Sequence, residues 1–171
     1  GTAIIRSTNN GVSWTPNVTS YPYAAYRVAQ QYVKTIDGVK YFTDQMPAPL
    51  QLLNGNIALA MESKNASGDY SISMAYSSNN WASALGIDET GPANRQNYMF
   101  AGAAPYLRQF ISGETVLSYN TGSRMRLRTG NNTATTFAAD YNVFPDTAGF
   151  WGAIEIISSH SLAAVFPRTG S

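Results

Sequence analysis

Large and small side chains alternate strictly along residues 57–62. Ile57, Leu59 and Met61 are separated by two alanines, and the run ends at Glu62. A period of two is the pattern of a β-strand, whose successive side chains point to opposite faces. The alternation therefore predicts a strand with one bulky face and one face of small side chains that ends in a carboxylate.

This strand belongs to a hairpin pattern that occurs three times. Residues 46–62 give an apolar run, an Asn-Gly turn and a second run, and residues 104–120 repeat the order with Gly113 in the place of Gly55. A third copy spans 150–166. Asn-Gly between apolar runs is a strong hairpin signal. We therefore predict an all-β chain built from repeated hairpins.

A strand that ends in a short polar turn also occurs three times. The turns have the letters S-T-N-N, S-S-N-N and T-G-N-N, and their central asparagines are Asn9, Asn79 and Asn131. Asparagine side chains bond the backbone of such turns, so the three residues are expected at equivalent positions. A hairpin, a third strand and this turn make up the four-stranded antiparallel blade of a β-propeller.

The length of the chain limits how much of a propeller it can form. Propellers have about 4–8 blades of roughly 40–50 residues, and these 171 residues provide about three. We expect about half of a five- or six-bladed propeller, as the C-terminal half of a larger catalytic domain. A missing N-terminal half or a second chain would complete it, and an open blade face would expose apolar side chains.

Helices are expected to contribute little. Residues 23–34 have the best helical period, but 28–33 also fits a strand that enters a turn at Asp37-Gly38. Residues 40–43 would then pair back across that turn. Both interpretations of this segment stay open from the sequence alone.

Composition narrows the range of partners and of cellular locations. Charged residues make up 12% of the chain, the net charge is +1 and cysteine is absent. No nucleic-acid or membrane partner is expected, and no run approaches the roughly 18 apolar residues of a membrane-spanning helix. We expect a secreted or extracellular protein, the periplasm included, without a metal or cofactor. Three glycosylation sequons occur at Asn17, Asn65 and Asn131, although chance alone explains such short motifs in this composition.

Several motifs carry a resemblance to a known family. The string S-T-N-N-G-V-S-W at 7–14 resembles the Asp-box of sialidase-type propellers, with Asn9 in place of the aspartate. The segments 44–62, 104–119 and 150–153 are similar in sequence to sialidase-like proteins that include the exo-arabinanases of glycoside hydrolase family 93. The resemblance implies an exo-acting glycoside hydrolase that removes terminal units from arabinan, an oligo- or polysaccharide substrate. The alternatives are a sialidase, a non-catalytic carbohydrate-binding propeller and a structural propeller that binds protein.

Three carboxylates are the candidates for catalysis. Glu62 ends the small-residue face of its strand, at the position that the family resemblance also marks. Asp44 precedes the Met46-Pro47 strand entry, and Glu155 lies inside an otherwise apolar strand. Glycoside hydrolysis requires two such groups on either side of the scissile bond. The structural alternatives are a solvated strand end for Glu62, a turn-closing side chain for Asp44 and a paired mid-strand group for Glu155.

Aromatic and basic side chains are the candidates for substrate binding. Tyr106, Tyr119 and Trp151 lie at strand ends where a ring can stack on a sugar or pack between blades. Arg95 and Arg108 lie close to the second hairpin, where either can contact substrate.

Three further arginines and the histidine are assigned to structural positions. Arg124, Arg126 and Arg128 share one face of one strand, which favours a solvated or inter-blade face over an anion-binding triad. His160, in a Ser-Ser-His-Ser turn, is expected at the surface.

Overall fold

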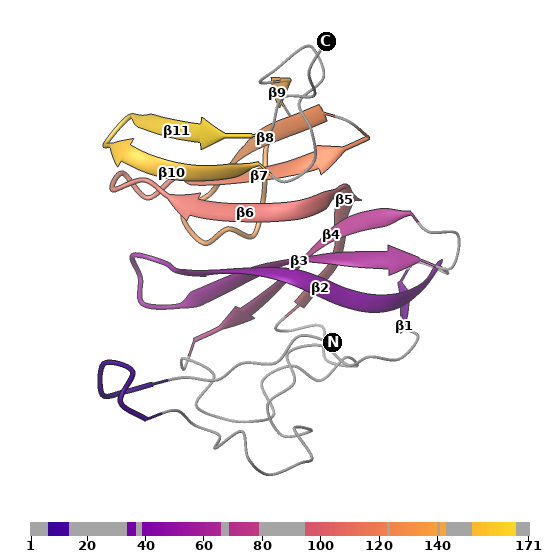
Figure 1. Ribbon diagram of the computed structural model, residues 1–171, viewed down its shortest axis with the longest axis horizontal. Coiled ribbons are helices and arrows are strands. Elements are labelled where there is room, and N and C mark those ends of the chain that lie inside the picture. Colours follow the sequence, from indigo (N-terminus) through magenta and orange to yellow (C-terminus); the bar gives the residue numbers. More distant parts are fainter. Residues whose placement is uncertain are drawn as a thin grey trace.

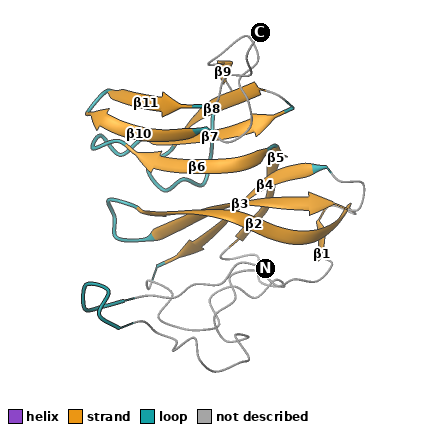
Figure 2. Ribbon diagram, in the orientation of Figure 1, coloured by secondary structure: helices purple, strands orange, loops and turns teal. Residues whose placement is uncertain are grey.

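The chain folds as antiparallel β-sheets. The computed structural model describes residues 7–13, 34–36, 39–65, 69–78, 95–122, 124–139, 141–142 and 152–166. No helix occurs in these ranges, and strands account for most of them (Figure 2). The predicted all-β class is therefore confirmed.

The first sheet has five strands in sequential order. They are β1 (Lys34–Ile36), β2 (Val39–Gln51), β3 (Ile57–Asn65), β4 (Tyr70–Ser77) and β5 (Arg95–Ala101). β1 pairs with β2 across the predicted Asp37-Gly38 turn, with Lys34 opposite Tyr41. The tight turn between β2 and β3 needs a positive φ at Gly55 (86°), which glycine adopts without steric cost. The expected return pairing is thus confirmed at Lys40 and Tyr41, whereas the strand predicted at 28–33 and the turn residues 37–38 lie outside the described part.

The second and third sheets follow the same antiparallel plan with fewer strands. The second contains β6 (Ala103–Gln109), β7 (Thr115–Thr121), β8 (Arg124–Gly130) and β9 (Tyr141–Asn142). The third contains β10 (Ala153–Ser158) and β11 (Ser161–Val165). All three predicted hairpins are therefore confirmed, in sheets of five, four and two strands rather than a uniform four.

The first two hairpins repeat each other residue for residue. In β2–β3, Ala48 pairs with Ala60 after a bulge, and 58 positions later Tyr106 pairs with Ser118 after a bulge in β6–β7. The bulges themselves correspond, because Met46 and Ala104 both have a positive φ, 50° and 51°, and both precede a proline. A non-glycine residue with this φ is uncommon and strained. Its recurrence at matching positions shows that the repeat extends to backbone detail.

The three sheets stack in layers, with β6–β9 between the other two (Figure 1). Two apolar cores fill the spaces between them. The core between the first and second sheets includes Ile72 and Met74 from one side and Leu107, Leu117 and Tyr119 from the other. The core between the second and third sheets is built around three side chains, which are Val116, Met125 and Ile154. Each sheet therefore buries apolar side chains against its neighbour, as packed layers require.

Packing on both sides explains the position of β3. Leu59 and Met61 are buried on one face, and Ala58 and Ala60 are buried on the other, where they meet the second sheet. The predicted alternation of bulky and small side chains is confirmed. The small side chains allow β3 to approach β6 closely, which places the last residue of that face, Glu62, between two sheets.

Two of the three predicted Asx turns use the same side-chain bonds. Asn9 Oδ1 accepts the Ser13 N–H at 2.9 Å, and Asn9 Nδ2 donates to Ser13 Oγ at 2.8 Å. Asn131 Oδ1 accepts the Thr135 N–H at 2.8 Å, and its Nδ2 donates to Thr135 Oγ1 at 2.9 Å. The turn chemistry predicted from the Asp-box pattern is thus confirmed at both, and Asn79 lies outside the described residues. An arrangement of these sheets around a propeller axis stays a prediction.

Candidate functional site

Two predicted site residues meet where the second and third sheets adjoin. Arg108 on β6 donates from Nε to Glu155 Oε2 on β10 at 2.9 Å, and from Nη1 to the Leu107 carbonyl at 2.9 Å. The side chains remain 29% and 65% exposed, respectively. The hydrogen bond and positive charge of Arg108 lower the pKa of Glu155 below its ordinary value. Glu155 is therefore an ionised acceptor in contact with solvent.

The fold brings Tyr106 to the same face of β6. Side chains two residues apart on a strand point to the same side, and Tyr106 packs against the core between the second and third sheets. The guanidinium of Arg108 has five N–H donors, of which two make the bonds given above. Among the described residues, Tyr106, Arg108 and Glu155 thus combine an aromatic ring, unused donors and a charged acceptor in one place.

Glu62 has a different environment, because it is only 5% exposed. Its Oε2 accepts the backbone N–H of Ala104 from the second sheet at 2.9 Å. The bulge at Ala104 turns this buried N–H toward the first sheet, where Glu62 satisfies it. Glu62 therefore links two layers.

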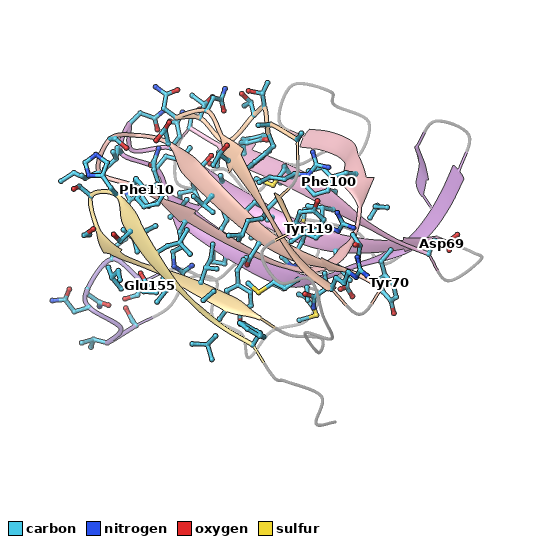
Figure 3. All side chains as sticks on the ribbon, turned by 90° about the horizontal axis from the view of Figure 1, so that it is seen from above. Asp69, Tyr70, Phe100, Phe110, Tyr119 and Glu155 are labelled. Atoms are coloured by element: carbon cyan, nitrogen blue, oxygen red, sulfur yellow. The ribbon has the colours of Figure 1, made fainter. Side chains whose placement is uncertain are left out.

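The structure does not bring Glu62 and Glu155 together. Glu62 contacts β6 at Ala104 from the first sheet, whereas Glu155 contacts it four residues further along, at Arg108, from the third sheet. Four residues of strand span about 13 Å. In Figure 3, Glu155 is labelled toward one end of the sheets, and Tyr70, which pairs with Lys64 two residues after Glu62, is labelled toward the other. Two carboxylates that act on one glycosidic bond lie about 5–9.5 Å apart.

Tyr119 lies inside the core between the first two sheets. Its ring is 2% exposed and its centroid is 4.7 Å from that of Phe100, next to it in Figure 3. Arg128 lies 4.1 Å above the Phe100 ring and donates from Nε to the Tyr119 hydroxyl at 2.9 Å. The expectation that Arg128 belongs to an inter-sheet face is confirmed, and Tyr119 in this position packs between sheets rather than facing a ligand.

Three other predicted site residues are described incompletely or not at all. The backbone of Asp44 lies in β2 opposite Ser63, and that of Arg95 lies in β5 opposite Ala75, but both side chains lie outside the described part. Trp151 lies entirely outside it. His160 is exposed in the β10–β11 turn, as predicted, and its Nδ1 is 2.8 Å from Ser159 Oγ.

Gln109 is a linking residue that the sequence reasoning missed. Its Oε1 accepts the Leu53 N–H at 2.8 Å, and its Nε2 donates to the carbonyls of Gly113 and Asn132 at 2.6 and 2.9 Å. One amide therefore holds the β2–β3 turn, the β6–β7 turn and the Asn131 turn together. Its position one residue before the hairpin turn was visible in the sequence, but its partner 56 residues away was not.

Buried polar atoms mark a second feature that the sequence did not indicate. Ser118 Oγ and Asn120 Nδ2 lie on one face of β7, are inaccessible to solvent and have no hydrogen-bond partner within the described part of the chain. No group of three or more histidine, aspartate or glutamate side chains suited to a metal occurs among the described residues. Across the same residues, no helix is long and apolar enough to cross a membrane.

Comparison with known proteins adds no family to these observations. No protein-family model matches the chain, and no curated protein is a significant match to its sequence.

Proposed function

We propose that this chain is part of a sialidase-like β-propeller that binds carbohydrate, and that Arg108 and Glu155 contact the sugar. The supporting observation is the solvent-accessible pair of these side chains at the junction of β6 and β10. Guanidinium donors and a carboxylate acceptor match the hydroxyl groups of a sugar, and the nearby ring of Tyr106 offers an apolar surface. We also propose an extracellular location, where a protein can encounter polysaccharides.

The propeller part of the proposal rests on the repeated hairpins and the stacked layers. The outward face of the β10–β11 hairpin exposes Ile157 and Val165, which are 66% and 72% accessible. In the first and second sheets, by contrast, the corresponding face packs against the next sheet of the stack. This supports completion of the propeller by further blades, from a missing N-terminal half or a second chain.

Exo-acting hydrolysis of arabinan or of terminal sialic acid is the second candidate. The ionised, accessible carboxylate of Glu155 favours it, because hydrolysis needs such a group as nucleophile or base. Asp44 remains the candidate for the second carboxylate, since Glu62 is buried at the layer contact.

Both candidates are tested by titrating the protein with linear arabino-oligosaccharides and with sialyllactose. Binding is measured by calorimetry, and hydrolysis by the release of monosaccharide. The variants Arg108→Gln and Glu155→Gln should each weaken binding about tenfold, because each loses a charge-assisted bond. Arg124→Gln, in β8, and Glu114→Gln, in the turn between β6 and β7, alter other exposed side chains; they are the matched controls and should bind normally.

The outcomes separate the two functions. Binding without hydrolysis, weakened in both site variants, supports carbohydrate recognition. Hydrolysis that Glu155→Gln abolishes supports the glycosidase. Failure to bind either sugar class, or equal binding by all four variants, would refute the assignment of the site.

A further inference from the structure

The two partners of the Arg108–Glu155 pair are unequally exposed to solvent. The Glu155 side chain is 65% exposed, and that of Arg108 is 29% exposed. Each carboxylate oxygen of Glu155 accepts one hydrogen bond, Oε2 from Arg108 Nε at 2.9 Å and Oε1 from the Ile156 N–H at 3.2 Å. A carboxylate has about four acceptor positions, so about two remain for a ligand. A ligand that approaches from solvent therefore meets the carboxylate more readily than the guanidinium.

The bond to Glu155 also limits what Arg108 can offer to an anion. Arginine binds a carboxylate most strongly through two parallel N–H groups. In Arg108, Nε donates to Glu155 and Nη1 donates to the Leu107 carbonyl. A ligand carboxylate that used the Nε side of the guanidinium would have to displace Glu155, and its charge would then lie close to that of Glu155. The positive charge of Arg108 is thus already neutralised by its partner.

The three arginines of β8 do not reinforce Arg108. They alternate with Met125 and Leu127, which pack on the core between the second and third sheets. Because neighbouring side chains on a strand point to opposite faces, the arginines face away from the third sheet. The position of Arg128 over the ring of Phe100, on β5 of the first sheet, agrees with this. An anion at the junction of β6 and β10 would therefore find no second guanidinium from β8.

The other charges of the two hairpins do not attract an anion either. In residues 103–121 and 152–166, which the structure describes, the charged side chains at neutral pH are Arg108, Glu114 and Glu155. One positive and two negative charges give a net charge of −1, with His160 neutral. An anionic sugar would gain no net attraction from these charges, whereas the hydroxyl groups of a neutral sugar can donate to Glu155.

We propose that Glu155 determines the specificity of this site, by selecting neutral sugars and excluding sugars that carry a carboxylate. The inference rests on the proposed carbohydrate site. A sugar hydroxyl donates a hydrogen bond to Glu155, whereas a ligand carboxylate can only accept one and is repelled. Like charges that meet in an interface suppress binding of the wrong partner. Of the two substrate classes considered above, the proposal favours arabinan over terminal sialic acid.

The test compares ligands that differ in charge alone. One pair is arabinotriose with its terminal primary hydroxyl oxidised to a carboxylic acid, and the primary amide of that acid. The other pair is sialyllactose and the primary amide of its sialic acid. Calorimetry at low ionic strength should show that the wild type binds the amide of a pair about tenfold more tightly than the acid. Added salt should reduce this preference, because the charge of Glu155 is exposed.

Two variants should move the preference in opposite directions. Glu155→Gln removes the repulsion, so it should bind the acid about as tightly as the amide. Arg108→Gln leaves the charge of Glu155 without its partner, so the preference for the amide should increase. Glu114→Gln, which alters an exposed carboxylate in the turn between β6 and β7, is the control and should keep the wild-type ratio. The ratio compares two ligands on the same variant, so a loss of folded protein does not change it.

The outcomes separate this inference from the proposed function. Equal binding of acid and amide by the wild type, or a preference that persists in Glu155→Gln, would overturn the selection by charge and leave the carbohydrate site standing. If the wild type binds none of the four ligands, the selection is overturned. The titration with unmodified arabino-oligosaccharides then decides whether the carbohydrate site is refuted as well.

Discussion

The β2–β3 and β6–β7 hairpins share a backbone but differ at the residue that faces the next sheet. Glu62 of the first hairpin accepts the Ala104 N–H across the layer. Asn120 stands 58 positions later in the same place, and its buried Nδ2 finds no hydrogen-bond partner in the part of the chain that the structure describes. The comparison teaches that turns and bulges preserve the repeat, while each contact between layers is adapted separately.

The difference has a simple electrostatic basis. A carboxylate can only accept hydrogen bonds, and the bulge at Ala104 presents it with a buried N–H. Such charge-assisted bonds are roughly twice as strong as neutral ones. The amide nitrogen of Asn120 can only donate, and it has no hydrogen-bond partner among the described residues. The first layer contact is therefore polar and satisfied, and the second contains an unsatisfied group.

The largest expected difference in stability is between two apolar substitutions, Glu62→Leu and Asn120→Leu. Glu62→Leu leaves the Ala104 N–H buried and unpaired, which should lower the free energy of unfolding by about 2 kcal/mol or more. Asn120→Leu removes an unsatisfied donor, so its effect should lie within about 1 kcal/mol and is expected to be stabilising. Urea unfolding of the two variants measures the contrast.

Glu62→Gln is the control for this pair, because the amide keeps an acceptor oxygen for Ala104 while it loses the charge. Its stability should lie between those of the wild type and Glu62→Leu. Equal losses in Glu62→Leu and Asn120→Leu would show that the two layer contacts are equivalent after all.

The next effect concerns the glycines that allow the layers to approach. A Cβ at Gly102 would lie 2.5 Å from Cδ2 of the buried Tyr119 ring, which cannot move without disturbing the core. Gly102→Ala should therefore cost about 1–3 kcal/mol. A Cβ at Gly152 would lie 2.6 Å from Sδ of Met125, a flexible side chain, so Gly152→Ala should cost less than about 1 kcal/mol. Thermal unfolding of both variants tests this order, and the reverse order would contradict it.

A smaller difference in stability is expected between alanine variants of Gln109 and of Gln51, its equivalent in the first hairpin. Gln109→Ala loses the three hydrogen bonds that join the turns, and should cost about 1–2 kcal/mol. Gln51 is exposed, so Gln51→Ala should stay within about 0.5 kcal/mol of the wild type. Hydrogen exchange should show faster opening at Leu53 only in the Gln109 variant. Unchanged exchange there would remove Gln109 from its linking role.

The smallest expected effect is a pH dependence of stability that arises from the Arg108–Glu155 pair, where the second and third sheets meet. Because Arg108 lowers the pKa of Glu155 in the folded state, the pair stabilises the protein at pH values above the unfolded pKa of 4.5. The contribution is lost as the pH falls through the lower pKa of the folded state. Titration of Glu155 by NMR should show this depressed pKa, and Arg108→Gln should return it toward 4.5. Equal values in the two proteins would show that the ion pair does not persist in solution.

Much of the fold was predictable because its signals are local. Alternation fixed the faces of β3, and the glycine turns fixed the hairpins, including Gly55. The asparagines at 9 and 131 formed the expected turns, because an Asx turn depends on only a few neighbouring residues.

The candidate site was predictable only in part. Arg108 and Glu155 were both selected, but their direct contact joins residues 47 positions apart.

The sequence by itself determined the strand class, the three hairpins and the chemistry of the turns, since each arises from neighbouring residues. Only the tertiary structure decided which polar groups stay accessible. It buried Glu62 against Ala104 and left Glu155 in solvent beside Arg108, although both carboxylates end or interrupt apolar strands in the sequence. The physical reason is that burial depends on which sheet stacks above a strand, and the order and spacing of the layers are set by contacts between distant segments.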